Sequence, residues 1–100
     1  MKATYTFDAE LWEWTGQGAA WFFVTLPEDV TDEIDDAHTG PRAGFGSVKV
    51  RVSVGATTWD TSIFPSKDAG GFILPIKKAV RVAEGVSVGV PFRVELTTLT

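Results

Sequence analysis

The chain has 100 residues, of which 44% are hydrophobic and 22% charged, and its net charge is −4. This length and composition predict one folded domain over residues 1–100 and exclude both a disordered chain and separate catalytic and binding domains. The sequence contains no cysteine, which excludes disulfides, thiolate metal ligands and a thiol nucleophile. It has no apolar run typical of a signal peptide or a membrane span, so we expect a cytoplasmic protein with no membrane partner.

The charge is unevenly distributed along the chain. Residues 1–41 hold nine acidic side chains and one basic one, whereas residues 42–100 hold eight basic and four acidic ones. Six of the acids lie within residues 28–36. The C-terminal half could therefore present a basic face to an anion, or the two halves could simply attract each other.

Two strands are predicted at the N-terminus. Apolar and polar side chains alternate from Lys2 to Trp14, which predicts one half-buried strand. Residues 16–18 contain two glycines and predict a turn, and the apolar run over residues 19–24 predicts a strand covered on both faces. We expect these two strands to form a hairpin.

A short helix is predicted over residues 28–37, directly after Pro27. Val30, Ile34 and Ala37 recur there at helical spacing. The many acidic residues of this segment lack the central glycine of a calcium loop. We therefore expect a solvated helix and no metal site.

The clearest element is residues 47–54, in which four valines alternate with polar side chains and predict a strand. Gly55 and Ala56 predict a turn into a second β-rich run, residues 57–64, and the two runs are expected to pair as an antiparallel hairpin. Pro65 is expected to end the second strand, because proline cannot donate to a β-ladder.

The C-terminal part is predicted to contain a strand, a helix and a strand. Residues 72–74 form a short apolar run, and Pro75 precedes a helical pattern over residues 76–84 that Gly85 is expected to stop. Residues 91–96 alternate again and predict the last strand. The chain is thus expected to be mostly β, with six strands and two short helices.

Five segments, taken in order, resemble a known family. They are Phe7-x-Ala9-x-Leu11-Trp12, Trp21-x-Phe23-Val24-x-Leu26-Pro27, Val48-Lys49-Val50-x-Val52, Trp59-x-Thr61-Ser62-x-Phe64-Pro65 and Gly71-x-Ile73-Leu74-Pro75-Ile76-Lys77-Lys78-Ala79-Val80-Arg81. Together they resemble the domain-of-unknown-function family DUF1905 over nearly the whole chain. The resemblance implies a small closed or double-split β-barrel of about six strands, sometimes found beside a YdeI/OmpD-associated domain. It implies no established activity and no catalytic residues.

The segment from Gly71 to Gly89 is also similar to the strand–helix–strand unit of AbrB/MazE-type swapped-hairpin proteins, which bind DNA as dimers. That unit commonly has an aspartate after its second glycine, whereas Val90 and Pro91 follow Gly89 here. The similarity implies nucleic-acid binding as an alternative function. The net negative charge and the acidic helix argue against it, because they repel phosphates.

Six basic residues of the second half are the main candidates for a ligand-binding site. They are Lys49, Arg51, Lys77, Lys78, Arg81 and Arg93. Strand alternation and helical spacing could bring them together around an anion, and the start of the predicted helix adds free backbone N–H groups that favour anions. The same patterns also occur on any solvated surface, which is the competing interpretation. Trp59 and Ser62 complete the candidate set.

The four tryptophans are a second feature of the sequence. Trp21 and Trp59 are expected to fill the core. Trp12 and Trp14 lie on the polar face of the first predicted strand, where they either pack under a loop or helix or contact a partner. We expect packing.

No catalytic residue and no cofactor are predicted. His38 is the only histidine, and no nucleophile or orienting acid accompanies it in the sequence. Our first hypothesis is a non-enzymatic binding module for an anionic small molecule or a protein partner. Nucleic-acid binding is the second, and an enzyme with a site around Trp59, Ser62, Lys77 and Arg81 is the third, because a fold resemblance does not establish chemistry.

Overall fold

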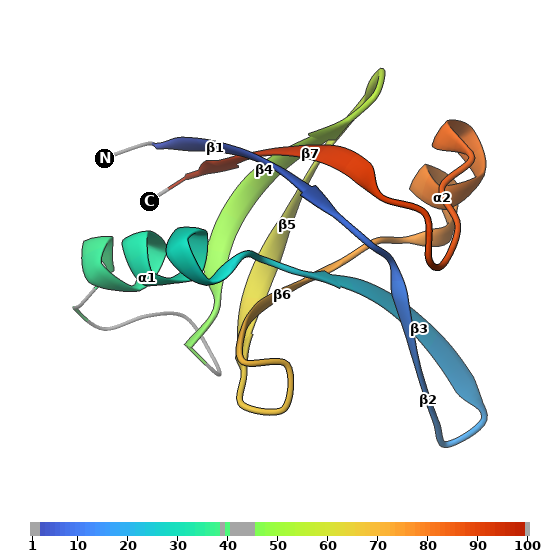
Figure 1. The fold of residues 1–100 in the computed structure, drawn as a ribbon, viewed down its shortest axis with the longest axis horizontal. Coiled ribbons are helices and arrows are strands. Elements are labelled where there is room, and N and C mark those ends of the chain that lie inside the picture. The colour runs from blue at the N-terminus through green and yellow to red at the C-terminus, as the bar shows by residue number, and fades with distance from the viewer. Residues whose placement is uncertain (1–2, 39, 41–45, 100) are drawn as a thin grey trace.

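The computed structural model describes residues 3–38, 40 and 46–99, and in this part of the chain it shows seven strands and two helices (Figure 1). In chain order they are β1 (Thr4–Ala9), β2 (Trp12–Gly16), β3 (Ala19–Thr25), α1 (Glu28–Ala37), β4 (Val48–Val54), β5 (Thr57–Ser66), β6 (Gly71–Pro75), α2 (Lys78–Glu84) and β7 (Phe92–Thr98). The prediction of a mostly β chain with two short helices is confirmed. None of the helices in the described part is long and apolar enough to cross a membrane.

All strands belong to one antiparallel sheet in the order β1-β7-β4-β5-β6-β3-β2, which curls into an open half-barrel. A closed or double-split barrel of about six strands was expected, and the structure shows an open half-barrel of seven strands. The two edge strands, β1 and β2, are neighbours in sequence, separated by Glu10 and Leu11 alone. The chain itself therefore joins the two edges of the sheet at one corner.

The single strand predicted from Lys2 to Trp14 is wrong, because this segment forms two strands with different partners. Lys2 lies outside the described residues. β1 pairs with β7 as far as Ala9, and β2 pairs with β3 from Trp12 onwards. The alternation slips by one residue at the adjacent apolar pair Leu11 and Trp12, and this is where the segment changes partner.

The core lies on the inner face of the curled sheet. β4 contributes its alternating valines, Val48, Val50, Val52 and Val54, each at most 3% exposed. The two helices lie at opposite ends of the sheet (Figure 1), and each contributes apolar residues to the core. These residues are Val30 and Ile34 of α1 and Val80 of α2.

The predicted turns are confirmed, with one correction. The β2–β3 and β4–β5 hairpins form as expected, and Gly85 ends α2 with a left-handed φ of 64°. Pro65 does not end β5, which continues to Ser66. The described ladder to β4 stops at Ile63, so at Pro65 the strand has no ladder partner on its β4 side, and a missing N–H is tolerated at such an unpaired edge.

The start of β3 corrects another expectation. The run over residues 19–24 is not covered on both faces, because Ala19, Ala20 and Trp21 are exposed and full burial is reached at Val24. This part of β3 pairs with β2 alone, since its ladder to β6 begins at Phe23. The tip of the hairpin therefore extends past the core, and no second layer from the described residues covers it.

Candidate functional site

The sheet is split between β5 and β6. Their ladder runs from Phe64–Ile73 to Ser66–Gly71, so the part of β5 before Phe64 is paired with β4 and not with β6. A hollow opens on each face of the sheet at this split, and Trp21 and Pro75 line both hollows. The split thus creates two adjoining concave surfaces whose walls come from β3, β5 and the start of α2.

The first hollow, here called the basic cavity, has a volume of about 400 Å³. Its walls include Phe22, Trp59, Lys77, Lys78 and Arg81. Four of the eight predicted ligand-binding residues therefore share one cavity, and three of the four are basic.

Arg81 is held in a defined position within the basic cavity. Its Nε donates a hydrogen bond to the backbone oxygen of Ile76 at 3.2 Å, and its Cζ lies 3.9 Å from the centre of the Phe22 ring. These contacts use one donor and one face of the guanidinium, and in the described part of the chain the two η nitrogens have no hydrogen-bond partner. They are available to a ligand.

The two lysines lie where the chain enters α2. Lys77 precedes the helix with extended backbone angles, Lys78 is its first residue, and both side chains are exposed. The first turn of α2 contains no acidic residue. The positive charge at this end of the cavity is therefore not offset by its own helix.

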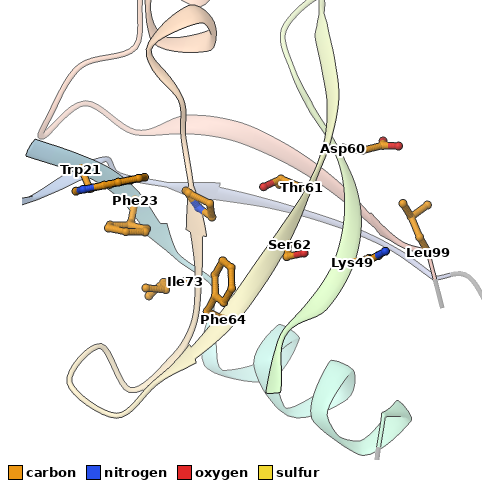
Figure 2. Close-up of a pocket in the computed structure, with 10 residues that line it drawn as sticks. Trp21, Phe23, Lys49, Asp60, Thr61, Ser62, Phe64, Ile73 and Leu99 are labelled. Atoms are coloured by element: carbon orange, nitrogen blue, oxygen red, sulfur yellow. The ribbon is translucent and has the colours of Figure 1, made fainter. Parts of the chain in front are cut away.

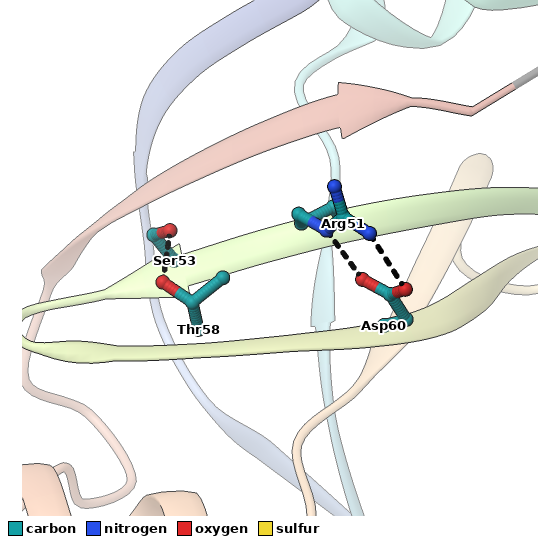
Figure 3. A network of polar contacts seen from close by, with 4 residues as sticks. All are labelled: Arg51, Ser53, Thr58 and Asp60. Atoms are coloured by element: carbon teal, nitrogen blue, oxygen red, sulfur yellow. Dashed lines mark hydrogen bonds and ion pairs between the residues drawn. The ribbon is translucent and has the colours of Figure 1, made fainter.

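Arg51 is not part of the basic cavity. It lies opposite Asp60 across the β4–β5 hairpin and donates two hydrogen bonds to that carboxylate, at 2.7 and 3.0 Å (Figure 3). The hydrogen bond from Arg51 lowers the pKa of Asp60 below its usual value, and the pKa of Arg51 is raised by the same contact. Next to this pair, the hydroxyls of Ser53 and Thr58 are 2.7 Å apart (Figure 3).

The pairing of Arg51 also affects the cavity. Asp60 lines both hollows, and a carboxylate at the split would oppose an anion. Because Arg51 binds both of its oxygens, much of this negative charge is offset.

Arg93, likewise, is paired elsewhere. Its Nε donates to Asp8 at 2.9 Å across the β1–β7 ladder, and both side chains are largely exposed. The six candidate cations therefore do not all converge. Three line the basic cavity, two are neutralised by cross-strand partners, and Lys49 lies in the second hollow.

The second hollow lies on the other side of the split, with a volume of about 780 Å³ (Figure 2). Trp21, Phe23 and Phe64 form its aromatic side, and Ser62 and Lys49 form a polar side on β5 and β4. Ser62 pairs with Lys49 across the hairpin. Since Ser62 is three residues from Trp59 on one strand, the two side chains point to opposite faces, so the structure separates Ser62 from the other three residues of the enzyme hypothesis.

The tryptophans divide differently from the prediction. Trp59 is half-buried against the core, but the expectation of a core position for Trp21 is wrong, since 55% of this residue is exposed. Trp12 is half-buried, as expected for packing, and its Nε1 donates to Thr25 Oγ1 at 2.9 Å. Trp14, expected to pack as well, is 49% exposed.

The aromatic residues of β3 were not predicted as site residues. Trp21 lines both hollows, and Phe22 orients Arg81. Their position directly after a glycine turn was the available signal, because a strand that starts at a hairpin tip has few neighbours to cover it.

His38 has a local structural role. Its Nδ1 lies 2.8 Å from the backbone oxygen of Ile34, one turn earlier in α1. The contact satisfies a carbonyl near the end of the helix.

Comparison with known proteins identifies the family of the chain. Among curated proteins none matches its sequence. The family model described as a domain of unknown function, DUF1905, matches residues 7–96. The match gives no support to the AbrB/MazE-like unit. Since the model covers nearly the whole sheet and both helices, the chain belongs to the DUF1905 family.

Proposed function

We propose that this domain is a non-enzymatic binding module whose basic cavity takes the anionic group of a small molecule or of a partner protein. One observation carries the proposal: Lys77, Lys78 and Arg81 line a single cavity that Trp59 and Phe22 also line. The volume of about 400 Å³ lies within the usual range for small-ligand sites.

Arg81 is the residue best suited to define the ligand. A guanidinium presents its donors in a planar fork that matches a carboxylate or phosphate, and the contacts of Arg81 with Ile76 and Phe22 fix that fork before a ligand arrives. Lys77 and Lys78 add mobile point charges at the entrance. The aromatic walls favour a ligand with an apolar group next to its anionic one.

The cavity favours binding over catalysis. Among its described lining residues the one carboxylate is Asp60, and Arg51 already occupies both oxygens of that group. A general base needs a partly free proton acceptor within reach of a substrate. Ser62, the hydroxyl of the enzyme hypothesis, points to the other face of β5.

DNA binding through the AbrB-like segment is the alternative that the same experiment tests. The exposed pair Lys77 and Lys78 suits phosphates, whereas the net charge of −4 opposes them. A cavity ligand and a duplex would both contact Lys77 and Lys78, but they would shift different sets of amide signals. A duplex must also contact surface residues outside the cavity.

The test is an amide NMR titration of the labelled domain at low salt, with phenyl phosphate and with a short DNA duplex. We expect phenyl phosphate to shift the signals of Trp59 and of residues 76–81, with an affinity that falls as salt rises. Arg81→Met should weaken binding at least about ten-fold, the effect of losing a bidentate charged contact of roughly 1.4 kcal/mol.

Arg93→Gln is the matched control, because it removes the same charge outside the cavity and should leave the affinity within about two-fold. Equal losses in Arg81→Met and Arg93→Gln would contradict the proposal and indicate attraction by net charge alone. Shifts with duplex DNA but not with phenyl phosphate would favour the nucleic-acid alternative.

A further inference from the structure

Four aromatic residues of the β2–β3 hairpin lie on one face of the sheet. Trp14 is directly opposite Trp21, and Trp12 is directly opposite Phe23, two residues further along the same ladder. Side chains directly opposite in an antiparallel ladder, and those two residues apart, point to the same face. The hairpin thus presents two adjacent aromatic pairs side by side.

These aromatic residues form one wall of a third hollow, here called the aromatic hollow, with a volume of about 530 Å³. The facing wall includes Ser66, Asp68 and Ala69, from the end of β5 and the turn that leads into β6. Figure 1 shows that the hairpin and this turn project toward the same side of the molecule. The aromatic hollow shares Trp21 with the basic cavity but none of its basic residues.

The aromatic wall is fixed in place without a ligand. The indole N–H of Trp12 is bonded to Thr25, and its ring centroid is 5.1 Å from that of Phe23 at an interplanar angle of 33°. Trp14 lies against Gly16, where an added Cβ would come within 2.6 Å of the indole ring. The glycine therefore provides the space that the Trp14 ring occupies.

The wall is nevertheless left half-open to solvent. Trp14 is 49% and Trp21 is 55% exposed, although most large apolar residues of the domain are buried. Two neighbouring exposed indoles on a fixed surface are an unfavourable arrangement for a domain with no partner for them. They point to a ligand that the rings contact directly.

The charge of the aromatic hollow selects the kind of ligand. Asp68 is its one ionisable lining residue, and in the described part of the chain it forms no ion pair. Aromatic faces carry partial negative charge and attract cations, most strongly those that are weakly hydrated and carry methyl groups. An anion would meet the partial negative charge of the ring faces and the carboxylate of Asp68.

We propose that the aromatic hollow binds an alkylated ammonium group, with Trp14 and Trp21 against its methyl groups and Asp68 balancing its charge. The two sites on either side of Trp21 would then take groups of opposite charge.

The experiment compares choline chloride with its neutral isostere, in which carbon replaces the quaternary nitrogen. Both are titrated into the labelled protein while the indole N–H signals are followed by NMR. We expect choline to shift the signals of Trp14 and Trp21 to saturation. The isostere should bind at least about five-fold more weakly, because it keeps the shape and loses the charge. Equal binding of the two compounds would overturn the proposal and leave a merely apolar hollow.

Two variants locate the site. Trp14→Leu should weaken choline binding at least about five-fold through the loss of one ring, and Asp68→Asn should weaken it about three-fold or more. Glu13→Gln is the control for Asp68→Asn, because Glu13 is exposed on β2 and does not line the hollow. Both altered residues are exposed, and a dispersed amide spectrum verifies folding.

Unchanged choline affinity in folded Trp14→Leu would refute the site, as would equal effects of Asp68→Asn and Glu13→Gln. Arg81→Met should leave choline binding unchanged. A failure here therefore leaves the anion-binding function of the basic cavity untouched, and the converse also holds.

Discussion

Replacing Arg81 by methionine removes the guanidinium while keeping an unbranched side chain with good helix propensity. The change deletes the hydrogen bond from Nε to the Ile76 oxygen at 3.2 Å and the contact of Cζ with the Phe22 ring at 3.9 Å. A hydrogen bond of this kind contributes about 1 kcal/mol net, and a partly exposed cation–π contact about 0.5–1 kcal/mol. We therefore expect Arg81→Met to lower the free energy of unfolding by about 1–2 kcal/mol.

In a domain of this size a loss of about 1–2 kcal/mol lowers Tm by roughly 5–15 °C. Urea unfolding followed by tryptophan fluorescence measures the free energy, and calorimetry measures Tm. Lys78→Met is the matched control: it removes one positive charge from the same helix at an exposed position, and its effect should stay within about 0.5 kcal/mol. If Arg81→Met were as stable as Lys78→Met, the two contacts would not hold the guanidinium, and the reasoning that Arg81 is oriented before ligand binding would fail.

Three further predictions concern the fold. In Arg51→Gln, the pKa of Asp60 measured by carboxyl NMR should rise toward its usual value of about 4, because the hydrogen bond from Arg51 is the main cause of the lowered pKa. In the unaltered protein the pair stabilises the fold above that pH, and this stabilisation is lost as the pH falls through the lowered pKa. Burial, with a smaller contribution from Glu33, raises the pKa of Tyr5, so the unfolded chain ionises first and stability should decline above about pH 10. Tyr5→Phe should show a smaller alkaline decline in Tm, and an unchanged decline would exclude Tyr5 as a contributor. Gly85→Ala should lower the free energy of unfolding measured in urea by about 1 kcal/mol, because a φ of 64° is strained for alanine. The space around its Cβ position is open, so no clash adds to this cost, and a neutral effect would mean that the end of α2 rearranges.

Some contacts of the site could have been predicted from the sequence. Gly55 and Ala56 predicted a two-residue turn, and such a turn sets the register of the hairpin so that Arg51 faces Asp60. The pairing that removes Arg51 from the anion site could thus have been anticipated. No local sequence pattern predicts that Asp8 faces Arg93, because the two residues are 85 positions apart in the chain.

The candidate set was correct in part for a physical reason. Lys77, Lys78 and Arg81 lie within one short segment, so their proximity depends on local geometry. These residues share a cavity with Trp59 because the β5–β6 ladder is short. No short sequence pattern predicts the length of that ladder. Trp21 was assigned to the core because its neighbours are apolar, whereas exposure depends on which layers reach the hairpin tip.

The sequence by itself determined most of the elements and most of the turns. The valines of β4, the helical spacing of Val30 and Ile34, and Gly85 act over a few residues, where backbone sterics and side-chain periodicity decide the outcome. The tertiary structure alone decided which strands β1 and β2 pair with, the split beside β5, and the exposure of Trp21. These features follow from which strands run out of neighbours, and strand pairing is set by contacts between residues distant in the chain.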